Sequence, residues 1–188
     1  METVTTLPRS RPFTRHDLDS MPDDGHRYEL IDGALIVTPA PSYRHQDVVG
    51  HLHIALVAAC PAELKVLLAT FDVALADDTV MQPDLLVARR SDFTARDLPT
   101  APVLAVEVLS PSTRHIDRSL KRARLEVAGC HSYWVVDPME PSVTAWELSG
   151  QGDLVGQEYV EVAHVTGDEE LEVTEPFPLT LRPNDLLD

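Results

Sequence analysis

Two carboxylates in the middle of the chain have the residue types and the spacing for metal-assisted chemistry. Asp84 lies at the start of the short run 83–90, directly after Pro83, and Glu107 lies inside the apolar run 103–109. A buried strand has little reason to carry an ionised side chain unless that charge is paired or binds a cation. If the two runs are antiparallel neighbours joined by residues 91–102, Asp84 lies roughly opposite Glu107 on one face. Two facing carboxylates either raise one pKa or require a cation between them.

A hard divalent ion, Mg²⁺ or Mn²⁺, would resolve this repulsion, because such ions prefer carboxylate and carbonyl oxygens. The backbone carbonyl of Val108 is the expected third ligand beside Asp84 and Glu107. Lys121 follows in the next segment, and its long stem could reach back to the end of the Glu107 strand. From there an ammonium would orient a nucleophilic water or stabilise the charge that develops during phosphodiester hydrolysis.

Each of these residues also has an ordinary structural interpretation. Asp84 after Pro83 suits the turn that enters a strand. Glu107 could form a salt bridge with Lys121 or Arg122, and Lys121 alone could be a solvated helix residue. The pairing of Asp84 with Glu107, together with the order of the motifs around them, favours a functional site.

The segments that must position these residues predict an α/β chain with more strand than helix. A helix over about 114–128, ended by Gly129, would join two strands in a crossover unit. Its apolar residues Ile116, Leu120 and Val127 predict the buried face, which leaves Lys121 on the flank. The other expected elements are a short helix after Thr14, a hairpin over 27–38 about Asp32-Gly33, a helix from Ser42 to Cys60, strands at 65–75, 83–90, 103–109, 132–138, 142–149 and 158–166, and a last extended segment, LEVTEPFPLTLRPNDLLD.

Length and composition are those of a chain with one folded core. With 188 residues and 44% hydrophobic content, the chain can bury a real core. We expect residues 1–26 to form an N-terminal arm, loose over 1–12, with the short helix, and residues 27–188 to form a single domain.

The charge balance limits the class of partner. The formal net charge is −16, which weighs against broad non-specific binding to a polyanion but allows a local basic patch. The best such patch is Arg114, Arg118, Arg122 and Arg124, all near Lys121. No segment has the apolar length of a membrane span, and the two cysteines lack metal or disulfide spacing, so we expect a cytoplasmic protein with no membrane partner.

Several motifs in this order resemble one known family. They are YELIDGALIV, the pair His45-Gln46, QPDLLV, VEVLSPST, DRSLKRARLEVAG and SYWVVDP, and they cover residues 27 to about 146. Together they resemble the Uma2 (DUF820) family of restriction endonuclease-like proteins, within the PD-(D/E)xK nuclease superfamily. The resemblance implies a central mixed β-sheet flanked by helices and Mg²⁺-dependent cleavage of DNA. It also implies that Glu29 and His45 lie near the site, and with the apolar strands at 142–166 it suggests a homodimer.

The sequence departs from the superfamily pattern at one position. In that pattern a lysine follows the acid by two residues on the same strand face, where this chain has Leu109. The resemblance implies that Lys121 takes over the role of that lysine. If Lys121 does not, the alternative is a catalytically weak or inactive binding or assembly module that keeps the nuclease fold.

Overall fold

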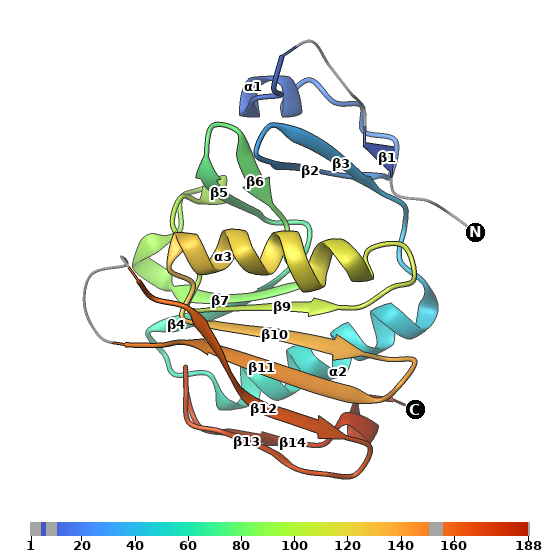
Figure 1. Cartoon of the computed structure of the whole chain (residues 1–188), viewed down its shortest axis with the longest axis vertical. Coiled ribbons are helices and arrows are strands. Elements are labelled where there is room, and N and C mark those ends of the chain that lie inside the picture. The colour runs from blue at the N-terminus through green and yellow to red at the C-terminus, as the bar shows by residue number, and fades with distance from the viewer. Residues whose placement is uncertain (1–4, 7–10, 151–155, 188) are drawn as a thin grey trace.

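The computed structural model describes residues 5–6, 11–150 and 156–187, and within them the strands form two six-stranded sheets and a hairpin (Figure 1). The first sheet has the order β1-β3-β2-β6-β5-β8 and the second β12-β11-β10-β9-β7-β4. The strands are β1 (Thr5–Thr6), β2 (Arg27–Ile31), β3 (Ala34–Thr38), β4 (Leu64–Leu68), β5 (Asp72–Ala76), β6 (Thr79–Met81), β7 (Leu85–Arg89), β8 (Asp97–Leu98), β9 (Leu104–Val108), β10 (Ser132–Asp137), β11 (Ser142–Leu148), β12 (Tyr159–Thr166), β13 (Leu171–Val173) and β14 (Leu179–Leu181). The helices are α1 (Arg15–Leu18), α2 (Tyr43–Ala59) and α3 (Arg122–Ala128), with the π-helical segment η2 (Ile116–Lys121) and the 3-10 helices η1 (Arg90–Asp92) and η3 (Pro183–Leu186).

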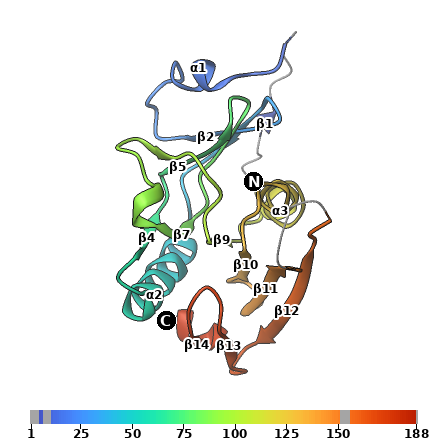
Figure 2. The ribbon, with the colours of Figure 1, turned by 90° about the vertical axis from the view of Figure 1, so that its left-hand side faces the viewer.

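The second sheet is mixed, and helices flank it. β9 and β10 are parallel, joined by η2 and α3 as a crossover, whereas the other neighbours in this sheet are antiparallel. The predicted crossover unit and the predicted fold class are therefore confirmed. Seen end-on, α3 lies beside β9 and β10 below the first sheet, while α2 lies on the other side of the second sheet (Figure 2).

The turn of the β2–β3 hairpin lies at Asp32 and Gly33, as predicted. Both residues have positive φ, 53° and 73°, as a two-residue hairpin turn requires. A Cβ on Gly33 would lie 2.4 Å from the Cβ of Pro12, so the close approach of the N-terminal segment also requires glycine. This hairpin fixes β2, which carries Glu29.

Helix α2 covers one face of the second sheet. The Ser42 side chain accepts a hydrogen bond from the backbone N–H of His45, which caps the helix as predicted. Val48, Leu52 and Leu56 are fully buried in the main core, against side chains of β7, β9 and β10. The helix therefore holds His45 at its first turn, at the edge of that core.

The single strand predicted over 65–75 is wrong, because the chain changes sheets there. β4 pairs with β7 in the second sheet, whereas β5 pairs with β6 and β8 in the first. Between them the backbone N–H of Ala69 donates to the carbonyl of Asp84. Both strands are apolar and β-prone, so the sequence pattern contains no signal for the break.

The predicted buried face of the helix over 114–128 is wrong for two of its three residues, because only Ile116 packs, partly buried, against a core cluster. Leu120 and Val127 are 38% and 69% exposed, whereas Asp117, Lys121 and Leu125 are about 1% exposed. Residues four apart on a helix share a face, so these three form the stripe that packs inward. The spacing of apolar residues does not reveal this face, because two of its three residues, Asp117 and Lys121, are charged.

The two ends of the chain differ from the predictions as well. The C-terminal segment is not extended throughout, since it forms the β13–β14 hairpin and η3, and this hairpin packs beside α2. Of the predicted loose arm, residues 1–4 and 7–10 lie outside the described residues, and β1 pairs with β3. Phe13 packs with Leu30 and Leu35. The boundary expected at residue 27 stays a prediction.

No helix within the described ranges is both long enough and apolar enough to cross a bilayer.

Truncation of a core residue in α2 should cost far more than truncation of its exposed neighbour. We expect Leu52→Ala to lower the free energy of unfolding by about 2–5 kcal/mol, because Leu52 is fully buried. The matched variant Ile54→Ala, at a position 68% exposed, should change it by less than about 0.5 kcal/mol. Urea denaturation measures both, and equal effects would contradict this packing of α2.

Candidate functional site

A buried ammonium group lies at the centre of the site. Lys121 Nζ is 2.9 Å from Glu29 Oε1, 3.0 Å from Glu107 Oε1 and 3.7 Å from Asp117 Oδ1. All four side chains are about 1% exposed. The three carboxylates come from β2, β9 and η2, so one cation ties together both sheets and the crossover.

The register of β7 and β9 places the two predicted metal ligands together. Leu85 pairs with Val106 in an antiparallel ladder, which puts Asp84, one residue earlier, opposite Glu107. Asp84 Oδ2 accepts a hydrogen bond from the backbone N–H of Val108 at 2.9 Å. The facing geometry predicted from the apolar runs is therefore the geometry observed.

Asp84 is held by two further donors, Arg27 at Oδ1 and His45 at Oδ2. Arg27 Nη1 donates to Asp84 Oδ1 at 2.8 Å, and Arg27 Nε lies 3.5 Å from Glu29 Oε2. His45 Nε2 lies 3.1 Å from Asp84 Oδ2 and acts as the donor, because an ionised carboxylate only accepts. Arg27 thus bridges Asp84 and Glu29, while His45 approaches from the first turn of α2.

The cluster holds more negative than permanent positive charge. Its four carboxylates face two permanent cations, which leaves a formal charge of −2 with His45 neutral; the acids are Glu29, Asp84, Glu107 and Asp117, and the cations are Arg27 and Lys121. Buried charges of one sign are costly unless neutralised by protons or a cation.

The pKa values follow from this imbalance. Burial raises the pKa of Glu107 well above its usual range, although Lys121 opposes the shift. Burial likewise raises the pKa of Asp117 to about 6. For Asp84, burial also favours the neutral acid, but the hydrogen bond from His45 and the charge of Arg27 prevail and lower its pKa. Burial disfavours the Lys121 ammonium, yet Glu107, Glu29 and Asp117 raise its pKa overall. Lys121 therefore keeps its proton at neutral pH.

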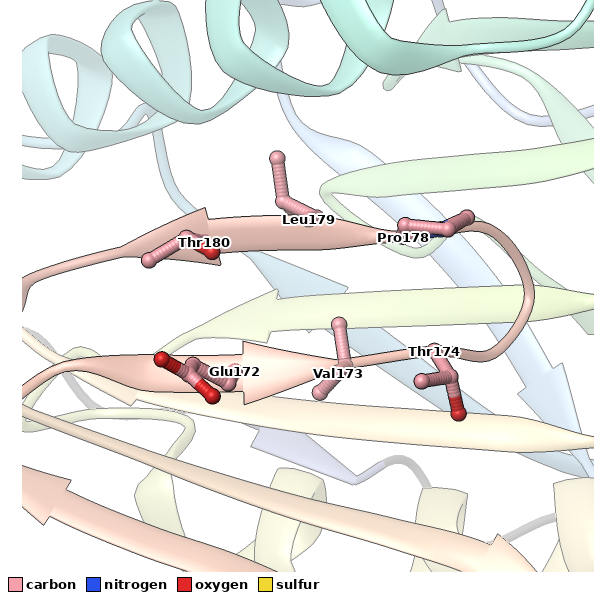
Figure 3. Close-up of a pocket in the computed structure, with 6 residues that line it drawn as sticks. All are labelled: Glu172, Val173, Thr174, Pro178, Leu179 and Thr180. Carbon is pink, nitrogen blue, oxygen red and sulfur yellow. The ribbon is translucent and has the colours of Figure 1, made fainter.

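A cleft of about 880 Å³ opens at the Asp84 side of the cluster. Asp84, Arg27 and His45 line it, with exposed Gln46 at its margin. A second hollow, of about 370 Å³, lies along the β13–β14 hairpin, and its lining includes a single ionisable residue, Glu172 (Figure 3). Only the first cavity adjoins a group of charged side chains among the described residues.

The donor set fits a small divalent cation. Glu107 Oε2 is buried without a hydrogen-bond partner, which leaves an acceptor available for a cation. No group of three or more His, Cys, Asp or Glu side chains in the described ranges is arranged as a complete metal cage. A site here would combine two carboxylates with a carbonyl and water, which is the manner in which Mg²⁺ is commonly held.

The residues predicted for the site come together in the structure. Asp84, Glu107, Lys121, Glu29 and His45 form one network that is joined through Arg27. Leu109, at the position of the missing lysine, is buried among apolar side chains beside the helix, as an uncharged residue should be. The structure gives Glu107 the salt bridge to Lys121 that was its structural alternative, so this ion pair alone does not distinguish the two interpretations.

Two members of the network were not assigned from the sequence. Arg27 lies two residues before Glu29 in β2, and this strand spacing places both on one face, which is a signal that could have indicated it. Asp117 stands four residues before Lys121. Its burial could not be predicted from the sequence, because it depends on the direction in which the helix packs.

The arginines of the predicted basic patch contact other groups, and the patch lies outside the cleft. Arg114 and Arg118 pair with Asp137 at 2.7 and 3.8 Å. Arg124 pairs with Asp32, and the Arg122 guanidinium lies over the Trp146 ring, 5.2 Å from its centre. None of the four lines the cleft.

Comparisons with known proteins agree with this fold. The family model Uma2, described as "Putative restriction endonuclease", matches residues 15–184, more than the motifs alone cover. A crystal structure of "a putative nuclease belonging to DUF820" from Anabaena variabilis ATCC 29413 is similar, with a TM-score of 0.70 and 20% sequence identity over 93% of this chain and 97% of that chain. A search of curated proteins found no match.

Removal of the central cation should destabilise the fold. We expect Lys121→Met to lower the free energy of unfolding by about 3–5 kcal/mol at neutral pH, because it leaves buried carboxylates without their partner. The exposed Lys65 provides the control, and Lys65→Met should cost less than about 0.5 kcal/mol. A Lys121→Met protein as stable as the control variant would show that the ion pairs are not needed for folding.

The raised pKa of Asp117 predicts a pH dependence. Its pKa of about 6 in the folded protein exceeds the value of about 3.9 expected for an unfolded chain. Between these values the folded state binds the proton more tightly, so stability increases as pH falls below about 6 and is lost as pH rises through it. Urea unfolding between about pH 4.5 and 7 should show a steeper loss with rising pH in the wild type than in Asp117→Asn. The exposed control Asp185→Asn should keep the wild-type slope, and identical slopes for Asp117→Asn and wild type would refute the assignment.

Proposed function

The chain belongs to the Uma2 family, and we propose that it is a metal-dependent nuclease that hydrolyses phosphodiester bonds in DNA. The observation that carries the proposal is the buried carboxylate cluster beside the cleft. It has a formal charge of −2, and its Glu107 Oε2 has no hydrogen-bond partner. A purely structural ion-pair network would be expected to contain as many cations as carboxylates, whereas this one has four carboxylates and two permanent cations.

Asp84 and Glu107 are the proposed side-chain ligands of Mg²⁺ or Mn²⁺, with the carbonyl of Val108 as the third protein ligand. The N–H and C=O groups of a strand residue point to the same side of the strand, and the N–H of Val108 already points to Asp84. When bound, such an ion supplies an activated water and a positive charge near the scissile phosphate.

The chain's own groups hold the reacting atoms in place. Lys121 stays protonated, so its role is that of a cation that fixes Glu107 and stabilises developing negative charge, and not that of a base. Glu29 holds Lys121 from the other side and is itself fixed by the backbone N–H of Gln82 at 2.7 Å. His45 and Arg27 orient Asp84 at the wall of the cleft.

One observation favours the alternative of a binding module without efficient chemistry. Both oxygens of Asp84 already accept hydrogen bonds, from Arg27 on one side and from His45 and Val108 on the other. A carboxylate has about four acceptor positions, so this occupancy leaves room for a metal. In the alternative, Asp84 keeps these three hydrogen bonds and never binds a metal, so no DNA is cleaved under any metal condition.

Substitution of the proposed ligands should abolish cleavage without loss of the fold. We expect Asp84→Asn and Glu107→Gln to lower Mn²⁺-dependent DNA cleavage by about a hundredfold or more, because each removes a charge that holds the ion. The exposed Glu172 provides the matched control, and Glu172→Gln should cleave like the wild type. Gel assays with a labelled DNA mixture of single strands and duplexes measure the rates.

Calorimetric titration with Mn²⁺ separates the two candidate functions. Binding by the wild type that is lost in Glu107→Gln and kept in Glu172→Gln would support the nuclease. Wild-type protein that neither binds Mn²⁺ nor cleaves DNA would reject it in favour of the binding module.

A further inference from the structure

The cleft beside Asp84 is lined by polar and by apolar residues, and the apolar ones are called its apolar wall. The apolar side includes Pro39, Pro41, Val49 and Leu68, which come from the end of β3, from α2 and from the end of β4. Its volume of about 880 Å³ lies within the range typical of pockets for small molecules, roughly 300–1,000 Å³. The cavity thus has the size and the surface to hold one partly apolar group next to Asp84.

Arg27 is the cation that faces this cleft. Among the described residues that line it, Arg27 alone carries a permanent positive charge. Its guanidinium has five N–H donors, of which one on Nη1 contacts Asp84 and the one on Nε faces Glu29 Oε2 at 3.5 Å, which leaves three. A guanidinium held at its base with donors to spare is suited to bind a phosphate.

The lining of the cleft also includes neutral hydrogen-bonding groups. Ser110 Oγ lies 3.0 Å from Ser112 Oγ and 2.9 Å from Thr113 Oγ1, and all three residues line the cleft. Hydroxyl groups can donate or accept, so this cluster could hydrogen-bond sugar or base atoms but would not attract several phosphates.

Double-stranded DNA does not match this distribution of charge. A duplex carries one negative charge per about 1.7 Å, and proteins that bind it neutralise several phosphates with Lys and Arg. Here Arg114 and the arginines Arg118, Arg122 and Arg124 contact groups outside the cleft, and the chain has a net charge of −16. One cation beside an apolar wall suits one phosphate and one base.

We infer that the cleft accepts an unpaired nucleotide of a DNA single strand, with its phosphate on Arg27 and its base on the apolar wall. The inference deepens the proposed function and rests on it for the chemistry that follows binding. It makes single-stranded DNA the substrate class and excludes cleavage inside a duplex without prior unpairing.

Binding measurements test this independently of cleavage. Fluorescence anisotropy would compare a labelled 12-nucleotide single strand with its duplex, in Mg²⁺ and in the Glu107→Gln background that prevents turnover. We expect the single strand to bind at least about tenfold more tightly than the duplex. Its log-affinity should fall with log salt at a slope no steeper than about −2, because about 0.7 is expected for each phosphate contacted.

Variants of Arg27 identify the phosphate contact. Arg27→Ala should weaken single-strand binding about tenfold or more, and Arg27→Lys should retain part of it by keeping the charge. Arg182, which pairs with Glu170 outside the cleft, is the matched control, and Arg182→Ala should bind like its parent. Circular dichroism would confirm that each variant is folded, and if Arg27→Ala is not, Arg27→Lys takes its place in the comparison.

The inference would be overturned if the duplex bound as tightly as the single strand, or if neither DNA bound. It would also be overturned if the slope of log-affinity against log salt were steeper than about −4, or if the Arg27 and Arg182 variants bound equally well. Thymidine 5′-monophosphate as an equally tight ligand would identify a free nucleotide, and not a strand, as the occupant. Single-strand binding that depends on Arg27, in a wild-type protein that cuts no DNA, would reject the proposed nuclease activity and leave the inference on binding intact.

Discussion

The ion pairs of one buried ammonium determine how the parts of this molecule fit together. Lys121 Nζ contacts carboxylates from β2, β9 and η2, and each of these groups is almost completely buried. A buried charge is tolerated only when its partners are in place, so the two sheets and the crossover helix must meet at this point. The apolar cores on either side could accept small shifts, whereas the ion pairs allow little.

The same cluster explains how a stable fold can keep a reactive site. The π-helical turn η2 directs both Asp117 and Lys121 inward, and such turns are frequent at functional sites. Neutralisation remains incomplete, because the carboxylates outnumber the permanent cations by two. The stability lost through this imbalance is the expected cost of a site that is prepared for a cation.

Local patterns in the sequence were sufficient for much of the fold and for the facing of Asp84 and Glu107, whereas Glu29 and His45 were indicated by the resemblance to a family. The Asp32-Gly33 turn and the two apolar runs on either side of residues 91–102 led to the hairpin and to the facing of Asp84 and Glu107. The sheet change between β4 and β5 was not predictable, because strand-like residues continue on both sides of it. Arg27 contacts Asp84 across 57 residues of sequence, through a packing of two sheets that no local pattern encodes. The buried stripe through Lys121 was missed because a charged face resembles a solvated one.

The most direct test of the carboxylate cluster as a metal centre is a crystal soaked in Mn²⁺, with diffraction data collected to locate manganese by its anomalous scattering. We expect a single strong anomalous peak between Asp84 and Glu107, within about 2.5 Å of an oxygen of each, and its loss in crystals of Glu107→Gln. No peak at this position at a saturating Mn²⁺ concentration, with Arg27 and His45 still bonded to Asp84, would contradict the proposed metal centre.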